Sequence, residues 1–135
     1  MPNRVEWDPR YSVGNDALDE QHREILARCN ALADCLDGGS GEESDRQFDE
    51  VFAGLMASAR AHFAAEEALL TRCGFPDLDD HRSEQEEYEF LAAEIVTTEN
   101  FDRSELQTFL ALWWAGHVMG CARDHRSCLE QLTAA

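Results

Sequence analysis

Four long segments of the 135-residue chain carry apolar residues at steps of three and four, and none shows the strict alternation typical of a strand. This spacing puts the apolar side chains of each segment on one face of a helix. The segments are separated by about 5 to 10 residues, which favours antiparallel neighbours. We therefore predict an all-α, up-down-up-down antiparallel four-helix bundle, formed by one domain of residues 1–135 with an N-terminal arm of residues 1–15.

Local signals set the expected helix boundaries. Glycines follow the first two periodic segments and should end those helices. Two Ser-x-x-Gln sequences have the form of a capping box, in which a serine caps the first turn of a helix. Ser44 with Gln47 would begin the second helix, and Ser104 with Gln107 the fourth. The expected helices cover about residues 18–36, 44–73, 78–97 and 104–129.

The charge balance limits the partners. A formal net charge of -17 repels phosphate backbones and anionic lipid, so neither nucleic acid nor a membrane is expected as a partner. The first residues lack the apolar stretch of a secretory signal, and no long apolar run follows, so we expect a cytoplasmic protein. The sequence identifies no protein partner.

The cysteines do not have the pattern of a disulfide framework. Five cysteines are an odd number, and they form neither a C-x-x-C pair nor a zinc-finger spacing. Reduced thiols are the simpler interpretation, and each buried thiol is best explained as a small apolar side chain. An alternative is a thiol-rich pocket at one end of the bundle, formed by Cys73, Cys121 and Cys128.

Five polar residues fall on the apolar faces, where an uncompensated charge or imidazole is costly. In an antiparallel bundle all of them can share one level near one end, and bundle cores are where histidine and carboxylate metal sites are built. Nitrogen and oxygen donors suit iron, manganese or zinc. The predicted metal ligands are His22, His62, Glu66, His81 and His117.

Four short sequences carry a resemblance to a known family. They are Trp7–Asn15 leading into Leu18-Asp19-Glu20-Gln21-His22, then His62-Phe63-Ala64-Ala65-Glu66-Glu67, then Gly74-Phe75-Pro76 before His81, and finally Trp113-Trp114-Ala115-Gly116-His117-Val118-Met119-Gly120. In order and interval they resemble the hemerythrin family, specifically the single-domain bacterial hemerythrins, over nearly the whole chain. The resemblance implies two irons held by five histidines and by bridging glutamate and aspartate, with reversible O2 binding. It implies His22 and His62 on one iron, His81 and His117 on the other, and Glu66 as a bridge.

Two of the family's ligands are replaced in this chain. Gln85 stands where the resemblance places a fifth histidine, and Ala122 stands where it places the bridging aspartate. His125 occupies the position of a tyrosine. The candidates for additional ligands are Gln85 through its carbonyl oxygen, Cys121, Asp124 and His125. Of the two on the face of His117, Cys121 is the nearer substitute, because Asp124 lies roughly 3 Å further along the helix axis than residue 122.

These features predict a non-haem iron protein, with a di-iron but altered site, that binds or senses O2 or a related small oxidant. A binding protein is favoured over an enzyme, and no nucleophile elbow or phosphate loop is present. Two alternatives stay open. The missing ligands could leave an open iron with oxidase or peroxidase-like activity, or the chain could be a helical regulatory module that holds a single metal such as zinc, or none.

Overall fold

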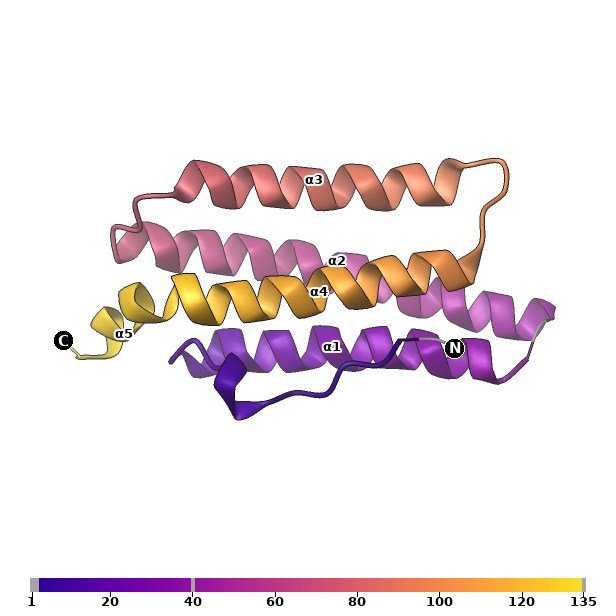
Figure 1. Cartoon of the computed structure of the whole chain (residues 1–135), viewed down its shortest axis with the longest axis horizontal. Coiled ribbons are helices and arrows are strands. Elements are labelled where there is room, and N and C mark those ends of the chain that lie inside the picture. The colour runs from indigo at the N-terminus through magenta and orange to yellow at the C-terminus, as the bar shows by residue number, and fades with distance from the viewer. Residues whose placement is uncertain (1–2, 40, 135) are drawn as a thin grey trace.

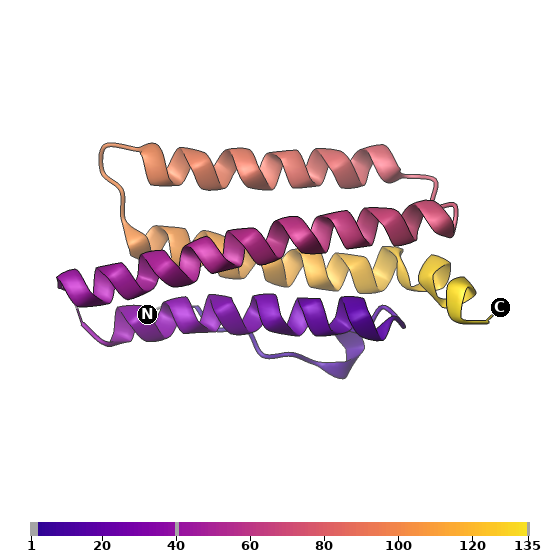
Figure 2. The same cartoon turned by 180° about the vertical axis from the view of Figure 1, so that it is seen from behind.

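The computed structural model describes residues 3–39 and 41–134 and has no strand among them; residues 1 and 2 of the predicted arm lie outside this range. In chain order the elements are η1 (Pro9–Tyr11), α1 (Asp16–Asp37), α2 (Glu42–Arg72), α3 (Leu78–Thr97), α4 (Arg103–Asp124) and α5 (Arg126–Ala134). Figures 1 and 2 show α1 and α3 running in one direction and α2 and α4 in the other. The prediction of an all-α antiparallel bundle is confirmed.

Both predicted capping boxes are wrong. Helix α2 begins at Glu42, two residues before Ser44, and its first turn carries three acidic side chains that suit the positive end of the helix dipole. Helix α4 is capped by Asp102, whose carboxylate accepts a hydrogen bond from the backbone N–H of Ser104. Ser104 therefore lies in the first turn of the helix and is not its cap. The side chain of Gln107 is buried and serves another purpose.

That purpose is to hold the N-terminal arm. Gln107 Oε1 accepts from the Asn3 N–H at 2.9 Å, and its Nε2 donates to the Asn3 carbonyl. At the other end of the arm, the buried Asp19 carboxylate accepts from the Val13 N–H and the Ser12 hydroxyl. The arm is therefore fastened to α4 at its beginning and to α1 at its end.

A single last helix over residues 104–129 was predicted, but the structure has a break at His125 between α4 and α5. The His125 N–H still donates to the Cys121 carbonyl at 2.8 Å, and α5 then starts in a new direction (Figure 1). Helix α5 packs against α2 and α4, and a disulfide joins its Cys128 to Cys73 at the end of α2. The expectation that all thiols are reduced is wrong for this pair, whose Cα atoms lie 5.6 Å apart. The alternative of a thiol-rich pocket brought Cys73 and Cys128 to the same end of the bundle, but it did not pair them.

Buried apolar side chains form two clusters along the bundle. The larger cluster takes residues from α1 to α4 and includes Phe48, Leu55, Tyr88 and Trp114. The smaller cluster lies at the end where α5 packs and includes Leu18, Leu70 and Leu129. Along each of α1, α2 and α4, the predicted metal ligands fall between residues of these two clusters.

Within the described part of the chain, none of the helices is both long and apolar enough to span a membrane.

Candidate metal centre

The five predicted ligands converge inside the bundle. Each long helix contributes at least one: α1 His22, α2 His62 and Glu66, α3 His81, and α4 His117. None is more than 4 % exposed. Helices α1 and α3 begin at this end of the bundle, and α2 and α4 end there. Residues far apart in the sequence therefore meet at one level, as the antiparallel topology predicts.

The Glu66 carboxylate lies at the centre of the histidines, and its two oxygens have different neighbours. Oε2 lies 2.9 Å from His62 Nε2 and 3.5 Å from His22 Nε2. Oε1 lies 2.6 Å from His81 Nε2 and 3.4 Å from His117 Nε2. The site therefore has two halves, each with two imidazoles and one carboxylate oxygen.

Two of the imidazoles are oriented by partners on their outer nitrogens. His62 Nδ1 donates to Gln21 Oε1 at 2.8 Å, and His117 Nδ1 donates to the Glu84 carboxylate at 2.9 Å. An Nδ1–H bond of this kind leaves Nε2 as the electron-pair donor, which is the usual arrangement around metal-binding histidines. The buried Nδ1 atoms of His22 and His81 have no such partner in the described part of the chain.

Aromatic rings pack against the histidines on the side of the larger cluster. Trp113 stacks on His117 with ring centroids 5.1 Å apart, and Phe63 meets His117 edge-on at 5.6 Å. Beyond them, the Trp114 indole N–H donates to the Tyr88 hydroxyl at 3.1 Å. This packing fixes the rings and keeps water from that side of the site.

Charges in the site compensate one another. Burial opposes ionisation of Glu66, but the neighbouring imidazoles, His117 above all, hold its pKa well below the usual value. Burial alone would lower the pKa of His117, whereas contact with Cys121 and Glu66 raises it well above the usual value. Burial lowers the pKa of His22 to about 4 despite its contact with Glu66. A metal ion would have to displace the proton of His117, since histidine ligates as the neutral base.

Of the four additional candidates, Cys121 alone joins the cluster. Donor atoms of His22, Glu66, His117 and Cys121 all lie within 4.8 Å of one another. Asp124 is exposed and pairs with Arg123. Gln85 is half-buried, and no hydrogen bond to the cluster is found for it among the described residues. His125 is buried, with its ring 4.7 Å from that of Phe75 and 6.0 Å from that of His81.

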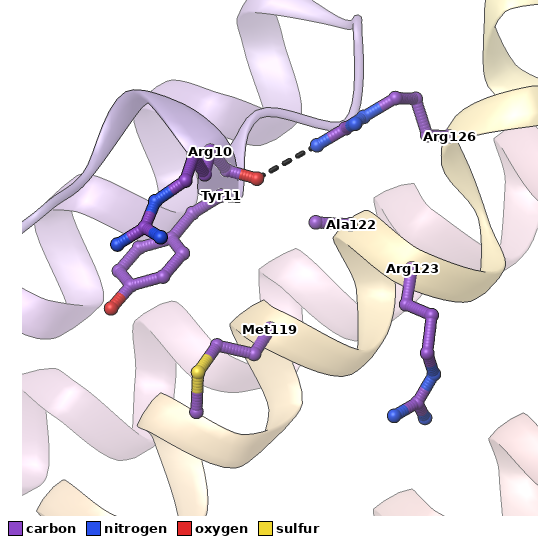
Figure 3. A pocket seen from close by; sticks show the side chains of 6 residues that line it. All are labelled: Arg10, Tyr11, Met119, Ala122, Arg123 and Arg126. Atoms are coloured by element: carbon purple, nitrogen blue, oxygen red, sulfur yellow. Dashed lines mark hydrogen bonds between the residues drawn. The ribbon is translucent and has the colours of Figure 1, made fainter.

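Two pockets bear on the substituted positions, and one of them reaches a predicted ligand, His81. One of about 390 Å³ is lined by His81, Glu84 and His125 together with Phe75, Arg123 and three aspartates. The other, of about 350 Å³, lies over Ala122 between the arm and α4, and Figure 3 shows Arg126 reaching across it to the Arg10 carbonyl. Ala122 therefore faces this second pocket and brings no donor atom to the cluster.

A carboxylate surrounded by four imidazoles in the core of a four-helix bundle defines a histidine–carboxylate metal-binding protein. The family described as "Hemerythrin HHE cation binding domain" matches residues 13–120. The chain thus belongs to the hemerythrin family, whose members are non-haem iron proteins that bind O2 through the metal.

Individual relatives are similar over most of their length. The chain is 26% identical over 129 residues to a "Hemerythrin-like protein" of Naegleria gruberi, covering 96% of this chain and 97% of that protein. It is 28% identical over 137 residues to a "Bacteriohemerythrin" of Stenotrophomonas maltophilia, covering 95% and 81%. A "Bacteriohemerythrin" of Ralstonia nicotianae is 28% identical over 118 residues, covering 84% and 80%. No solved structure gives a significant match.

Three residues that contribute to the site were missed in the sequence. Gln21 directly precedes His22 and orients the histidine of a different helix. The Glu84 carboxylate accepts the hydrogen bond of His117 Nδ1 while its side chain stays 46% exposed. The Trp113 ring stacks on His117 and so helps to position it. The signal for Glu84 is its place one turn after His81, on the face that must look toward α4.

Proposed function

We propose that the chain is a dinuclear non-haem iron protein that binds or senses O2 or a related small oxidant. The observation that carries this proposal is the division of the Glu66 carboxylate, with a pair of imidazoles at each oxygen. In this proposal His22 and His62 hold one iron, His81 and His117 hold the other, and Glu66 bridges the two. The unit is a single domain of residues 1–135, because the arm and α5 are both fastened to the bundle.

The donor set fits the metal. Imidazole and carboxylate ligands suit iron, manganese and zinc, and the family binds O2 through iron, which favours iron here. Iron supplies one-electron chemistry with O2 that the side chains of the site cannot perform alone. The protein's contribution is to bury the ligands, to present four Nε2 atoms to one carboxylate, and to hold His62 and His117 through Gln21 and Glu84.

The substituted positions favour access for a small molecule. With Gln85 outside the cluster, the half of the site at His81 has fewer protein donors than the resemblance implies. The pocket of about 390 Å³ reaches His81 on that side. A small oxidant entering there would meet the half of the centre with the most open coordination.

The proposal is tested by loading metal-free protein with ferrous iron without oxygen and then admitting air. We expect two irons per chain and a visible charge-transfer band that appears with O2 and disappears when O2 is removed. Glu66→Gln should lose both, whereas Glu67→Gln, a change at the neighbouring residue that pairs with Arg82, should keep them. Fewer than two irons in the wild type, or no band on admitting air, would contradict the proposal.

A second candidate is an open-site oxidase or peroxidase-like activity. It is favoured by the pocket at His81 and by the loss of a donor at Ala122. Rapid, irreversible oxidation of the ferrous protein with turnover of added peroxide would support this candidate against reversible binding.

A single-metal site is a third candidate. His22 Nε2 and His62 Nε2 lie 3.0 Å apart and both face Glu66 Oε2, so they form a two-histidine, one-carboxylate set. Metal analysis of protein isolated from its own host distinguishes two irons from one iron, zinc or no metal.

A further inference from the structure

Cys121 lies inside the cluster and is the donor there that the proposed function has not used. It is one helical turn after His117 on α4 and is 2% exposed. Its Sγ lies 3.4 Å from His117 Nε2 and 3.5 Å from Glu66 Oε2. The sulfur thus points into the histidine and carboxylate cluster.

The two contacts of Cys121 belong to opposite halves of the site. Glu66 Oε2 is the oxygen that faces His22 and His62. His117 faces the other oxygen, Oε1, together with His81. A sulfur that touches Oε2 on one side and His117 on the other therefore spans both halves, as Glu66 itself does.

The spacing of the donors fits joint ligation. Bonds of about 2.3 Å to sulfur and 2.0–2.1 Å to nitrogen or oxygen, at a roughly tetrahedral angle, put the two donor atoms about 3.5 Å apart. The distances of Cys121 Sγ to His117 Nε2 and to Glu66 Oε2, 3.4 Å and 3.5 Å, match this value. These two pairs already have the spacing of donor atoms that share a metal ion.

Another buried thiol shows what simple packing looks like in this protein. Cys29 is 0% exposed in the larger apolar cluster, and its sulfur makes no hydrogen bond among the described residues. Cys121, by contrast, has two polar neighbours that are both candidate ligands. The residue after it, Ala122, stands where the resemblance places a bridging aspartate and faces a pocket instead (Figure 3).

We propose that Cys121 ligates as a thiolate that bridges the two metal ions, taking the place of the missing second carboxylate. This inference rests on the proposed dinuclear site. The metal–sulfur bonds form as the S–H proton is released to solvent, with no change in oxidation state. A thiolate makes the site softer than one of imidazole and carboxylate alone, so it favours metals with affinity for sulfur.

The test is X-ray absorption at the zinc edge of the full chain loaded with zinc, which avoids redox side reactions of the thiol. The disulfide between Cys73 and Cys128 is kept oxidised so that its sulfurs do not compete for metal. We expect two zincs per chain, a zinc–sulfur distance of about 2.3 Å, and one sulfur per zinc on average. Cys121→Ser should lose the sulfur signal, whereas Cys29→Ser, also a buried thiol, should keep it.

Each result separates the bridge from the dinuclear site. Two zincs with nitrogen and oxygen neighbours only would overturn thiolate ligation and leave the dinuclear site standing. Half a sulfur per zinc would overturn the bridge, because it describes a thiolate bound to one metal. Fewer than two zincs per chain would overturn the bridge, whereas the dinuclear iron site is decided separately by the iron count of the loaded protein. The wild-type sulfur count decides the matter even if Cys121→Ser does not fold.

Discussion

The disulfide between Cys73 and Cys128 gives a quantitative prediction about stability. The two cysteines are 55 residues apart, and closing a loop of that length removes entropy from the unfolded chain equivalent to about 4 kcal/mol. For a 135-residue chain with an unfolding entropy of about 2.1 cal/mol/K per residue, this corresponds to a melting temperature about 14 °C higher in the oxidised protein. Reduction, or the double change Cys73→Ser with Cys128→Ser, should remove this stabilisation.

The assay is urea unfolding of metal-free protein, oxidised and reduced, followed by circular dichroism. Cys35→Ser is the matched control, because Cys35 is a free and partly exposed cysteine whose loss should change the free energy of unfolding little. Thiol titration of the unfolded, unreduced protein should find three free thiols among its five cysteines. Five free thiols, or equal stability of the oxidised and reduced forms, would refute this reasoning.

Three further predictions concern single residues. Glu84→Gln removes the charged acceptor of the His117 Nδ1–H and should weaken metal binding by about 10-fold or more in a chelator competition. Glu86→Gln, on the same helix, should leave the metal affinity unchanged. Equal affinities of the Glu84→Gln variant and the wild type would exclude an orienting role for Glu84. Gln107→Leu leaves the Asn3 N–H unpaired and should cost about 1–3 kcal/mol in urea unfolding, so a neutral result would contradict its role in fastening the arm. Burial lowers the pKa of His22 to about 4 from an ordinary 6.5. Between these two pH values the unfolded chain binds a proton at His22 that the folded chain does not, so the free energy of unfolding is undiminished above pH 6.5 and falls as pH falls toward 4. Metal-free wild type should therefore lose about 2–3 kcal/mol more than His22→Gln between pH 7 and 4.5, and parallel pH curves would contradict the buried neutral state.

The ligand-bearing faces were predictable because helical periodicity is local. An apolar stripe interrupted by His62 and Glu66 one turn apart identifies a polar site in a core, and antiparallel order then brings His22, His81 and His117 to the same level. The capping residues were not predictable in the same way. The helices are capped at Gly41 and Asp102, but nearby serines fit a capping pattern equally well in the sequence. The hydrogen bonds of the buried Gln107 side chain depend on where the N-terminal arm lies.

What the sequence did not predict depends on contacts between helices. Helical spacing places Cys73 and Cys128 toward one end of the bundle, but their pairing also requires α5 to turn at His125 and pack on α2, which the spacing does not show. The hydrogen bond from His117 to Glu84 likewise depends on how α3 and α4 face each other. Cys121 was the better of the two substitutes proposed on the face of His117, because its side chain is directed inward while Asp124 is exposed.

The larger apolar cluster packs against the ligand histidines but contains none of the predicted ligands, and this has a consequence for how the scaffold accepts change. That cluster, which includes the hydrogen-bonded pair Trp114 and Tyr88, takes residues from all four long helices and uses no predicted metal ligand. Exchanging one donor for another in the site therefore alters the chemistry of the centre while most of the packing stays intact. The bundle should be a suitable host for redesigned sites, in which glutamine, cysteine or aspartate are tried at positions 85, 121 and 122 and compared on one common framework.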